Sequence, residues 1–285
     1  MRSILLAAAI TFVLVAKAMA WGQEGHSIVA EIAQTRLSAG AEQVVRRLLK
    51  GHSLASVASW ADDERDARPA TAGWHFVDIP LDVETYDPAR DCAKGDCIIA
   101  ELNRLRSDLR CATDNAQLEA LKFAVHFVGD VHQPLHTVLE KRGGNDIPVD
   151  VFMRGLAACA TCTAAHTATN LHATWDTNLI EKTVWNWGAY VDRLEKGWLT
   201  NSPEAQAEDP ATNHEAIDQD TFRNWAEESH KVARPVWYLR PADDVLDDRY
   251  LRDVLPMLDR QLGLAGLRLA RLLNEAYGSN RCPVP

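Results

Sequence analysis

The sequence lacks a hydrophobic segment long enough to cross a membrane. Its most apolar run, residues 4–15, is shorter than the ~20 apolar residues that a membrane helix needs, and no other segment comes close. The run follows Arg2 and precedes Ala18-Met19-Ala20, an A-x-A cleavage motif. We therefore predict that residues 1–20 are a signal peptide and that the mature chain begins at Trp21; a retained N-terminal anchor is the alternative. The mature protein is expected to be secreted or periplasmic, without stable membrane association.

Basic residues are also scarce. The 285 residues include 30 Lys and Arg against 40 Asp and Glu, which gives a formal charge of −10. Removal of residues 1–20 takes away Arg2 and Lys17 and lowers this charge to −12. Taken alone, the charge argues against nucleic acid as a ligand, because proteins that bind its phosphates normally use Lys and Arg. Bound metal cations would change the local charge without changing this count.

Internal repeats and low-complexity segments are absent as well. The 265 residues after the signal are enough for one large domain, so we predict a single domain over residues 21–285. No convincing alternation of apolar and polar residues indicates strands; residues 75–80 and 146–153 are weak extended candidates, and residues 143–144 and 157–169 are predicted loops. Apolar residues at three- and four-residue spacing predict helices over residues 27–37, 41–49, 98–110, 118–131, 172–197, 220–234 and 249–277. The predicted fold class is therefore all-α.

The chain has six cysteines, an even number that is typical of disulfides in a secreted protein. Proximity in the sequence favours Cys92–Cys97 and Cys159–Cys162, which leaves Cys111–Cys282 as the third pair. Fifteen pairings are formally possible with six cysteines. The Cys159-x-x-Cys162 pair is alternatively half of a zinc site.

The helix predicted over residues 118–131 is apolar nearly all round, yet it contains His126 and Asp130. Residues four apart lie on the same face of a helix, so the two side chains should meet. One such pair could be a hydrogen-bonded pair of the core. The pattern continues, however, with His132 and His136, which favours a functional cluster over a single structural pair.

A second pair with the same spacing, His172 and Asp176, lies further along the chain. Upstream, Asp62 belongs to an acidic turn and His75 to an apolar setting, where a core histidine is the alternative. Imidazole and carboxylate ligands of this kind suit zinc. The candidate ligands are His26, Asp62, His75, His126, Asp130, His136, His172 and Asp176. Because a tetrahedral zinc takes three or four protein ligands, eight candidates indicate at least two ions and favour hydrolysis of a phosphate ester.

Six short motifs agree in order, residue type and spacing with a known family. They are WGQEGH (21–26), SWADDER (59–65), HFVD (75–78), HFVGDVHQPLH (126–136), GGND (143–146) and NLHATWD (170–176). The sequence resembles the trinuclear-zinc, single-strand-preferring nucleases of the S1/P1 nuclease and 3′-nucleotidase type. These share an all-α fold with zinc-dependent phospholipase C.

The resemblance implies three zinc ions. One would be held by Asp62, His75, His126 and Asp130. A second would be held by His26, by Asp130 as a bridging ligand, and by the free α-amine and carbonyl oxygen of Trp21. The third would be held by His136, His172 and Asp176. The cleavage before Trp21 would then be part of the chemistry, because only a freed amine can join a carbonyl oxygen in chelating a metal.

The resemblance also implies how substrate is bound. Arg65 matches the cation that stabilises the phosphoryl transition state, with Asp62 and Asp130 as the other catalytic residues. The planar guanidinium of arginine suits a phosphate because it donates two hydrogen bonds. The matching nucleobase site consists of Phe76, Asp78 and Asn145. Stacking on an aromatic ring requires an unpaired base, which accounts for a preference for single strands.

The predicted function is that of an endonuclease that cleaves single-stranded RNA and DNA to 5′-phosphate ends and removes 3′-phosphates from nucleotides. We expect a monomer. A phospholipase C on the same scaffold is one alternative, and a zinc-stabilised binding protein without catalysis is another.

Several residues near or outside the motifs are left without such a role. We predict surface positions for His52, His166, His214 and His230 and a supporting role for His132. Asp63 is the alternative to Asp62 if the motif is shifted by one residue. The tryptophans Trp60, Trp74 and Trp175 are predicted to pack in the core.

Overall fold

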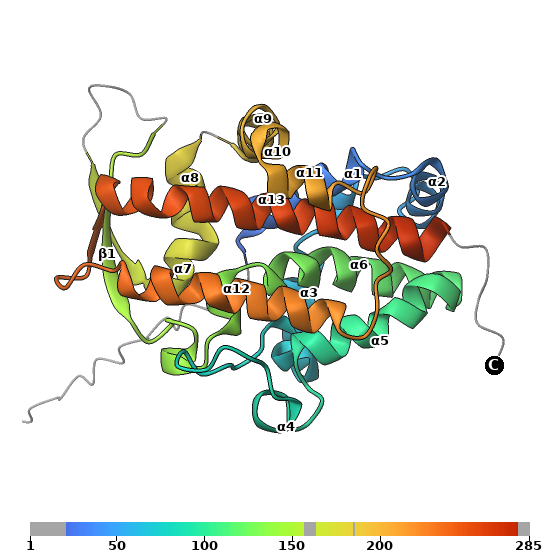
Figure 1. Ribbon diagram of the computed structural model, residues 1–285, viewed down its shortest axis with the longest axis horizontal. Coiled ribbons are helices and arrows are strands. Elements are labelled where there is room, and N and C mark those ends of the chain that lie inside the picture. The colour runs from blue at the N-terminus through green and yellow to red at the C-terminus, as the bar shows by residue number, and fades with distance from the viewer. Residues whose placement is uncertain (1–20, 157–163, 185, 279–285) are drawn as a thin grey trace, which may run out of the picture.

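Long helices run side by side along the molecule, and a small sheet closes one end (Figure 1). The longest helix, α13 (Asp248–Gly278), lies beside α12 (Thr221–Tyr238) and α6 (Asp114–Val131). On its other sides α13 contacts α1 (Gln23–Gln34), while α5 (Ile98–Cys111) packs against α6. The computed structural model describes residues 21–156, 164–184 and 186–278, so the predicted signal peptide lies outside the described residues. Helices dominate these residues, which confirms the predicted all-α class.

Shorter helical elements connect and cover the long ones. In chain order they are α2 (Ala39–Leu48), η1 (Leu54–Val57), α3 (Trp60–Ala67), η2 (Pro69–His75), α4 (Pro88–Asp91), η3 (Pro134–Thr137), η4 (Glu140–Arg142), α7 (Leu171–Ala173), η5 (Thr174–Asn178), α8 (Leu179–Thr183), α9 (Trp187–Lys196), α10 (Trp198–Asn201) and α11 (Pro203–Glu208). Several begin with a proline in the first turn or a polar side chain that accepts a backbone N–H, as at Ser38 and Asn186.

Helix α6 forms the centre of the domain. It is buried from Phe123 to its end at Val131, in agreement with its apolar sequence. It begins at Asp114, four residues before the predicted start. Its first turn is largely polar and exposed, so the apolar spacing that predicts the helix does not extend into that turn. Pro134 stands at the first turn of η3, where its missing N–H costs nothing, and it prevents α6 from continuing.

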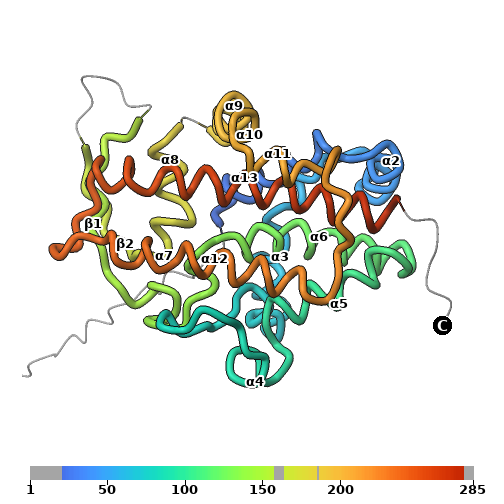
Figure 2. The backbone as a smooth tube through the Cα atoms, viewed as in Figure 1, coloured from blue at the N-terminus to red at the C-terminus, as the bar shows by residue number. Residues whose placement is uncertain are grey.

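The small sheet corrects part of the sequence prediction. Strand β1 (Pro148–Met153) coincides with the extended candidate at 146–153 and pairs antiparallel with β2 (Ala165–Asn170) and parallel with β3 (Val245–Asp247). The predicted loop over 157–169 is therefore wrong for residues 165–169, and residues 157–163 lie outside the described residues. Strand β2 is exposed along most of its length, so its sequence carries no alternation; pairing with β1 makes it a strand. Figure 2 follows the chain through this end of the molecule.

The single helix predicted over residues 172–197 is also wrong. The chain forms α7, the five-residue π-helical turn η5, and α8, and then leaves the helical conformation at Val184 before α9 begins. Val184 is extended, and the Asn186 side chain accepts the Ala189 N–H to start the new helix. The helical spacing correctly predicts helix on both sides of Val184, but it does not indicate the break at Val184 or the wide turn η5. Wide turns of this kind occur often at functional sites, and this one contains Asp176.

A disulfide joins Cys92 to Cys97, which confirms one predicted pair. Cys111 is also disulfide-bonded, and the remaining cysteines, Cys159, Cys162 and Cys282, lie outside the described residues. Helices in the described ranges are all too short or too polar to span a bilayer.

Candidate metal centre

All eight histidines and carboxylates predicted as ligands are buried, and they converge from separate parts of the chain. They are His26 on α1, Asp62 on α3, His75 at the end of η2, His126 and Asp130 on α6, His136 on η3, His172 on α7 and Asp176 on η5. Burying so many ionisable groups together is costly unless they bind one another or a cation.

Three groups of these side chains have ligand atoms close enough to share a metal ion. The groups are His26, Asp62 and His126; His75, His126 and Asp130; and His136, His172 and Asp176. Within each group the ligand atoms all lie within 4.8 Å of one another. Asp62 is 8% exposed, whereas its neighbour Asp63 is exposed to solvent, so the geometry favours Asp62 as the inward carboxylate.

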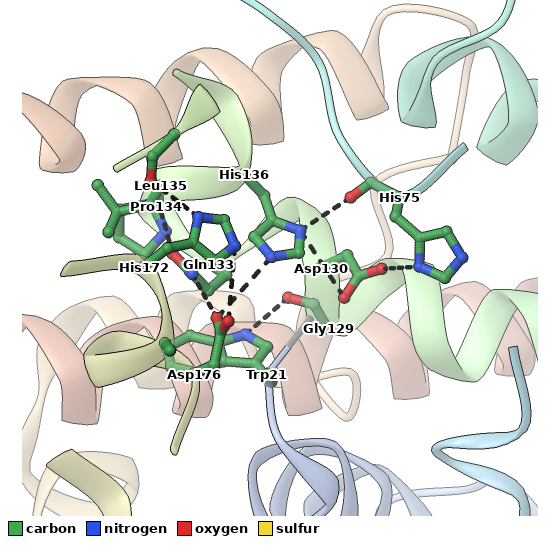
Figure 3. A network of polar contacts seen from close by, with 12 residues as sticks. Trp21, His75, Gly129, Asp130, Gln133, Pro134, Leu135, His136, His172 and Asp176 are labelled. Atoms are coloured by element: carbon green, nitrogen blue, oxygen red, sulfur yellow. Dashed lines mark hydrogen bonds and ion pairs between the residues drawn. The ribbon is translucent and has the colours of Figure 1, made fainter. Parts of the chain in front are cut away.

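Asp130 belongs to the second group and also contacts His26 of the first group; Figure 3 shows it between His75 and His136. One of its oxygens, Oδ2, is 3.0 Å from His75 Nδ1 and 3.3 Å from His126 Nε2. The other oxygen, Oδ1, is 3.3 Å from His26 Nε2 and 4.0 Å from His136 Nδ1. One carboxylate thus faces histidines from four elements, as a bridging ligand between two cations would.

The third group lies beside Asp130 and combines His136 of η3, His172 of α7 and Asp176 of the wide turn η5 (Figure 3). His172 Nε2 is 3.5 Å from Asp176 Oδ2, and His136 Nε2 is 3.9 Å from Asp176 Oδ1. The rings of His136 and His172 stack with their centroids 4.8 Å apart. Two imidazoles and one carboxylate therefore point at the same space.

Backbone carbonyls fix the orientation of three of these rings. The Nδ1–H of His126 donates to Ala58 O (2.7 Å), that of His136 to His75 O (2.8 Å) and that of His172 to Gly143 O (2.8 Å). A carbonyl oxygen only accepts, so Nδ1 carries the proton in each case and a neutral ring keeps its Nε2 lone pair for a metal. Outer hydrogen bonds of this kind are typical of histidines that bind metals.

The buried polar atoms without a hydrogen-bond partner supply the test of whether a metal fits. They include His26 Nε2, Asp62 Oδ1, His75 Nε2, His126 Nε2, Asp130 Oδ1, His136 Nε2 and Asp176 Oδ2. Buried polar atoms are normally satisfied, because leaving one unpaired costs about 1–3 kcal/mol. With His26 Nδ1, eight such atoms lie on the predicted ligands, and all are nitrogen or oxygen atoms that fit bound cations such as zinc.

Burial also sets the charge of the histidines. It lowers the pKa of His136 to about 3 and the pKa of His172 to about 4, so both rings are neutral at pH 7 and able to donate a lone pair to a metal. Burial opposes charge on His126 as well, but the adjacent Asp130 carboxylate raises the pKa of that ring to about 9. Although burial disfavours a charged Asp130, the surrounding histidines hold its pKa well below the usual range. The centre therefore attracts positive charge at Asp130.

Sequence reasoning missed Gln133, which orients one of the carboxylates. Its side-chain N–H donates to Asp176 Oδ1 (2.6 Å), and its side-chain oxygen accepts the Leu135 N–H (2.6 Å). The bond leaves Asp176 Oδ2 directed at His172. Glutamine is seldom a metal ligand, so the residue type alone does not indicate this role. The only indication in the sequence is the position of Gln133 inside the HFVGDVHQPLH motif.

Trp21 is fully buried beside the centre. Its indole N–H donates to Gly129 O (2.8 Å), and the next residue, Gly22, donates its backbone N–H to Asp176 O (2.7 Å). Both bonds tie the predicted mature N-terminus to residues next to or among the ligands. A Cβ at Gly22 would lie 2.6 Å from Thr177 Oγ1, so the close approach requires glycine.

Gly129 is equally constrained, and this gives a testable prediction. A Cβ at this position would lie 2.7 Å from His26 Nδ1 and 3.0 Å from His26 Cε1, closer than real contacts allow. We expect Gly129→Ala to push His26 away from Asp130 and to lower metal content by one ion per chain, although alanine favours the α6 helix. Metal analysis by atomic absorption and circular dichroism measure the two effects. Gly278→Ala, where a Cβ meets no atom within 4 Å, is the control, and full metal content in Gly129→Ala would contradict the prediction.

Among the residues predicted to bind substrate, Arg65 contacts the first group directly. Arg65 Nη1 is 3.5 Å from Asp62 Oδ1, and the Arg65 side chain is 19% exposed, so the guanidinium reaches the edge of the first group. Phe76, next to His75, is 41% exposed. Burial, with Asp91 and Glu140 nearby, raises the pKa of Asp78 to about 6. Asn145 is partly buried and donates to Arg142 O (2.9 Å).

The other histidines divide into two kinds. His52, His166 and His214 are exposed, as predicted. His230 is only 1% exposed, so its predicted surface position is wrong; its nitrogens bond backbone carbonyls, which makes burial of a polar ring tolerable. His132 lies outside the three groups, bonded to Val128 O and to the Arg268 guanidinium, and burial beside that cation lowers its pKa to about 3.

The tryptophans predicted as packing residues lie in or against the hydrophobic core. Trp175 is fully buried and donates its indole N–H to the Tyr250 hydroxyl (2.9 Å). Trp60 and Trp74 are partly buried against the core, with their rings edge-on to Phe123.

The chain is similar to known proteins over nearly its whole length. Residues 21–278 match the protein family described as S1/P1 Nuclease. Endonuclease 2 of Arabidopsis thaliana is 31% identical over 288 residues, which cover 90% of this chain and 91% of that protein. Nuclease P1 of Penicillium citrinum is 31% identical, covering 91% of this chain and 98% of its own. Nuclease S1 of Aspergillus oryzae is 34% identical over 209 residues, or 70% of this chain and 68% of its own.

Proposed function

We propose that this chain, which belongs to the S1/P1 nuclease family, is a secreted or periplasmic zinc-dependent endonuclease that acts on single-stranded RNA and DNA. It would leave 5′-phosphate ends and also remove the 3′-phosphate from nucleotides. The observation that carries the proposal is the convergence of eight buried imidazoles and carboxylates into three groups with metal-ligand spacing. The Cys92–Cys97 disulfide is consistent with an oxidising compartment.

The proposed zinc ligands follow the family resemblance, and the third set coincides with the group of His136, His172 and Asp176. Asp62, His75, His126 and Asp130 would hold one ion; His26, Asp130 and the amine and carbonyl of Trp21 would hold a second; His136, His172 and Asp176 would hold the third. Bound zinc would supply a water activated near neutral pH and positive charge for the phosphate oxygens. That charge offsets the acidic composition of the chain at the point where a phosphate must bind.

The chain's own residues would perform the remaining work. Asp130 and Asp62 fix the positions of the histidines around them through contacts of 3.0–3.9 Å. Arg65, at the edge of the first group, would donate two hydrogen bonds to the phosphate as negative charge develops on its oxygens.

Base recognition would occur beside the metal centre. The exposed ring of Phe76 provides a face for stacking, and the chain order places it next to His75. Asp78 and Asn145 would bond the edge of the base. A base must be unpaired to stack in this way, which supports a preference for single strands.

The test is a substrate comparison on purified mature protein of known metal content. We expect three zinc ions per chain and turnover of single-stranded RNA, single-stranded DNA and a 3′-nucleotide, with loss of all three activities after chelation and recovery with zinc. Phosphatidylcholine is the comparison substrate, because the alternative is a phospholipase C on the same scaffold. Turnover of the lipid alone, or one zinc per chain, would refute the proposal.

A further inference from the structure

His230 lies outside the metal centre but contacts two segments that the proposed reaction uses. Its side chain is buried on α12. The Nδ1 atom is 2.8 Å from the carbonyl oxygen of Thr137, next to the ligand His136. The Nε2 atom is 3.2 Å from Pro80 O and 3.1 Å from Val83 O, in the turn that follows Asp78. One ring therefore bridges the two segments.

The bridged segments are residues 76–80, which carry the base-binding side chains, and residues 136–139, which begin with a metal ligand. Backbone hydrogen bonds join them side by side: Val77 N–H to His136 O (2.9 Å), Ile79 N–H to Thr137 O (3.2 Å) and Leu139 N–H to Ile79 O (3.1 Å). The Thr137 carbonyl accepts from both Ile79 and His230. His230 thus braces the place where the base site and the metal centre are joined.

The donor and acceptor roles follow from chemistry. Carbonyl oxygens only accept, and the Thr137 hydroxyl already donates to Pro134 O (2.7 Å). A ring nitrogen that carries a proton therefore donates to the backbone carbonyl that it faces.

Other side chains of α12 hold the same turn. Glu227 accepts the Tyr86 N–H (3.0 Å), Arg234 forms an ion pair with Glu84 (3.6 Å), and Glu140, outside α12, accepts the Leu81 N–H. A small apolar cluster of Leu81, Val138, Ala233 and Trp237 packs beside them. Within the described residues, His230 is the α12 side chain whose hydrogen bonds reach both segments.

We propose that His230 is a positioning residue for nucleotide recognition, which sets the separation between Phe76 and Asp78 on one side and the ligand His136 on the other. The base and the phosphate of one substrate must be bound at the same time, so a shift between the two segments weakens binding of substrates that carry a base. A phosphodiester without a base uses only the metal centre and is unaffected. This inference rests on the proposed nuclease function.

The test compares His230→Phe, which fills the site without donors, with His230→Gln, which keeps an amide donor. Glu227→Ala, which releases the same turn without a contact to residues 136–139, is the matched control. We measure zinc content, kcat and KM for a 3′-phosphorylated nucleoside and for bis(4-nitrophenyl) phosphate. We expect His230→Phe to raise KM for the nucleotide by about five- to tenfold, the loss of roughly one hydrogen bond, with the baseless substrate and the zinc content unchanged.

We expect His230→Gln to give a KM between those of wild type and His230→Phe. Glu227→Ala should give a KM within about twofold of wild type, because it removes no contact to residues 136–139. Equal changes in KM for both substrates, or loss of zinc, would overturn the inference. If His230→Phe does not fold, an unchanged KM in His230→Gln overturns it. A wild-type protein inactive on nucleotides refutes the proposed function itself.

Discussion

Replacing Asp130 with asparagine is expected to abolish activity and to release the two adjoining metal ions. Asp130 contributes both oxygens to the centre, with His75 Nδ1 at 3.0 Å, His26 Nε2 at 3.3 Å and His126 Nε2 at 3.3 Å. Asparagine keeps the size of the side chain but has no negative charge and only one oxygen. The metals supply several kcal/mol of stabilisation to a phosphoryl transition state, so we expect kcat to fall by about 10³-fold or more.

The measurement is zinc content together with the rate on single-stranded RNA. The group of His136, His172 and Asp176 does not include Asp130 as a ligand, so about one of three ions should remain. Asp63→Asn is the matched control, because Asp63 is exposed and should leave content and rate unchanged. Full zinc content with an active Asp130→Asn enzyme would show that the carboxylate is not a bridging ligand.

Arg65→Ala is expected to give the second large effect, this time on rate alone. Its guanidinium is 3.5 Å from Asp62 Oδ1 and 19% exposed, so it reaches substrate from the rim of the centre. Removing one donor to a developing oxyanion lowers kcat by about 10²–10³-fold in comparable sites. Because arginine is not a metal ligand, zinc content should be unchanged when zinc is present in excess.

Two further variants separate charge from geometry. Arg65→Lys keeps the charge without the planar pair of donors and should recover part of the rate. Arg68→Ala is the control, since Arg68 is paired with Glu64 and Glu119 at 2.8 Å and lies one turn further along the chain. An Arg65→Ala enzyme with the rate of wild type would show that Arg65 does not stabilise the transition state.

The candidate metal ligands could be predicted because their signal is local. A spacing of four places His126 with Asp130, and His172 with Asp176, on one helix face, whatever the rest of the fold does. Burial of α6 was equally visible in its apolar sequence. The Cys92–Cys97 disulfide followed from a separation of five residues along the chain.

Features that depend on distant partners left little or no trace in the sequence. Strand β2 is exposed and is a strand because β1 lies beside it. The residues around His230 in the sequence do not indicate that its ring contacts three backbone carbonyls, which lie up to 150 residues away in the chain. The wide turn η5 keeps helical spacing on both sides and therefore looked like part of one helix.

The sequence by itself determined which side chains are candidates for the chemistry and which helix faces they occupy, because helical periodicity converts spacing directly into direction. The tertiary structure decided how those faces meet. It brought His26 and His75 to the two oxygens of one carboxylate, directed Gln133 at Asp176, and left no room for a side chain at Gly129. These contacts join residues far apart in the chain, and their geometry depends on the packing of whole helices, which no local pattern specifies.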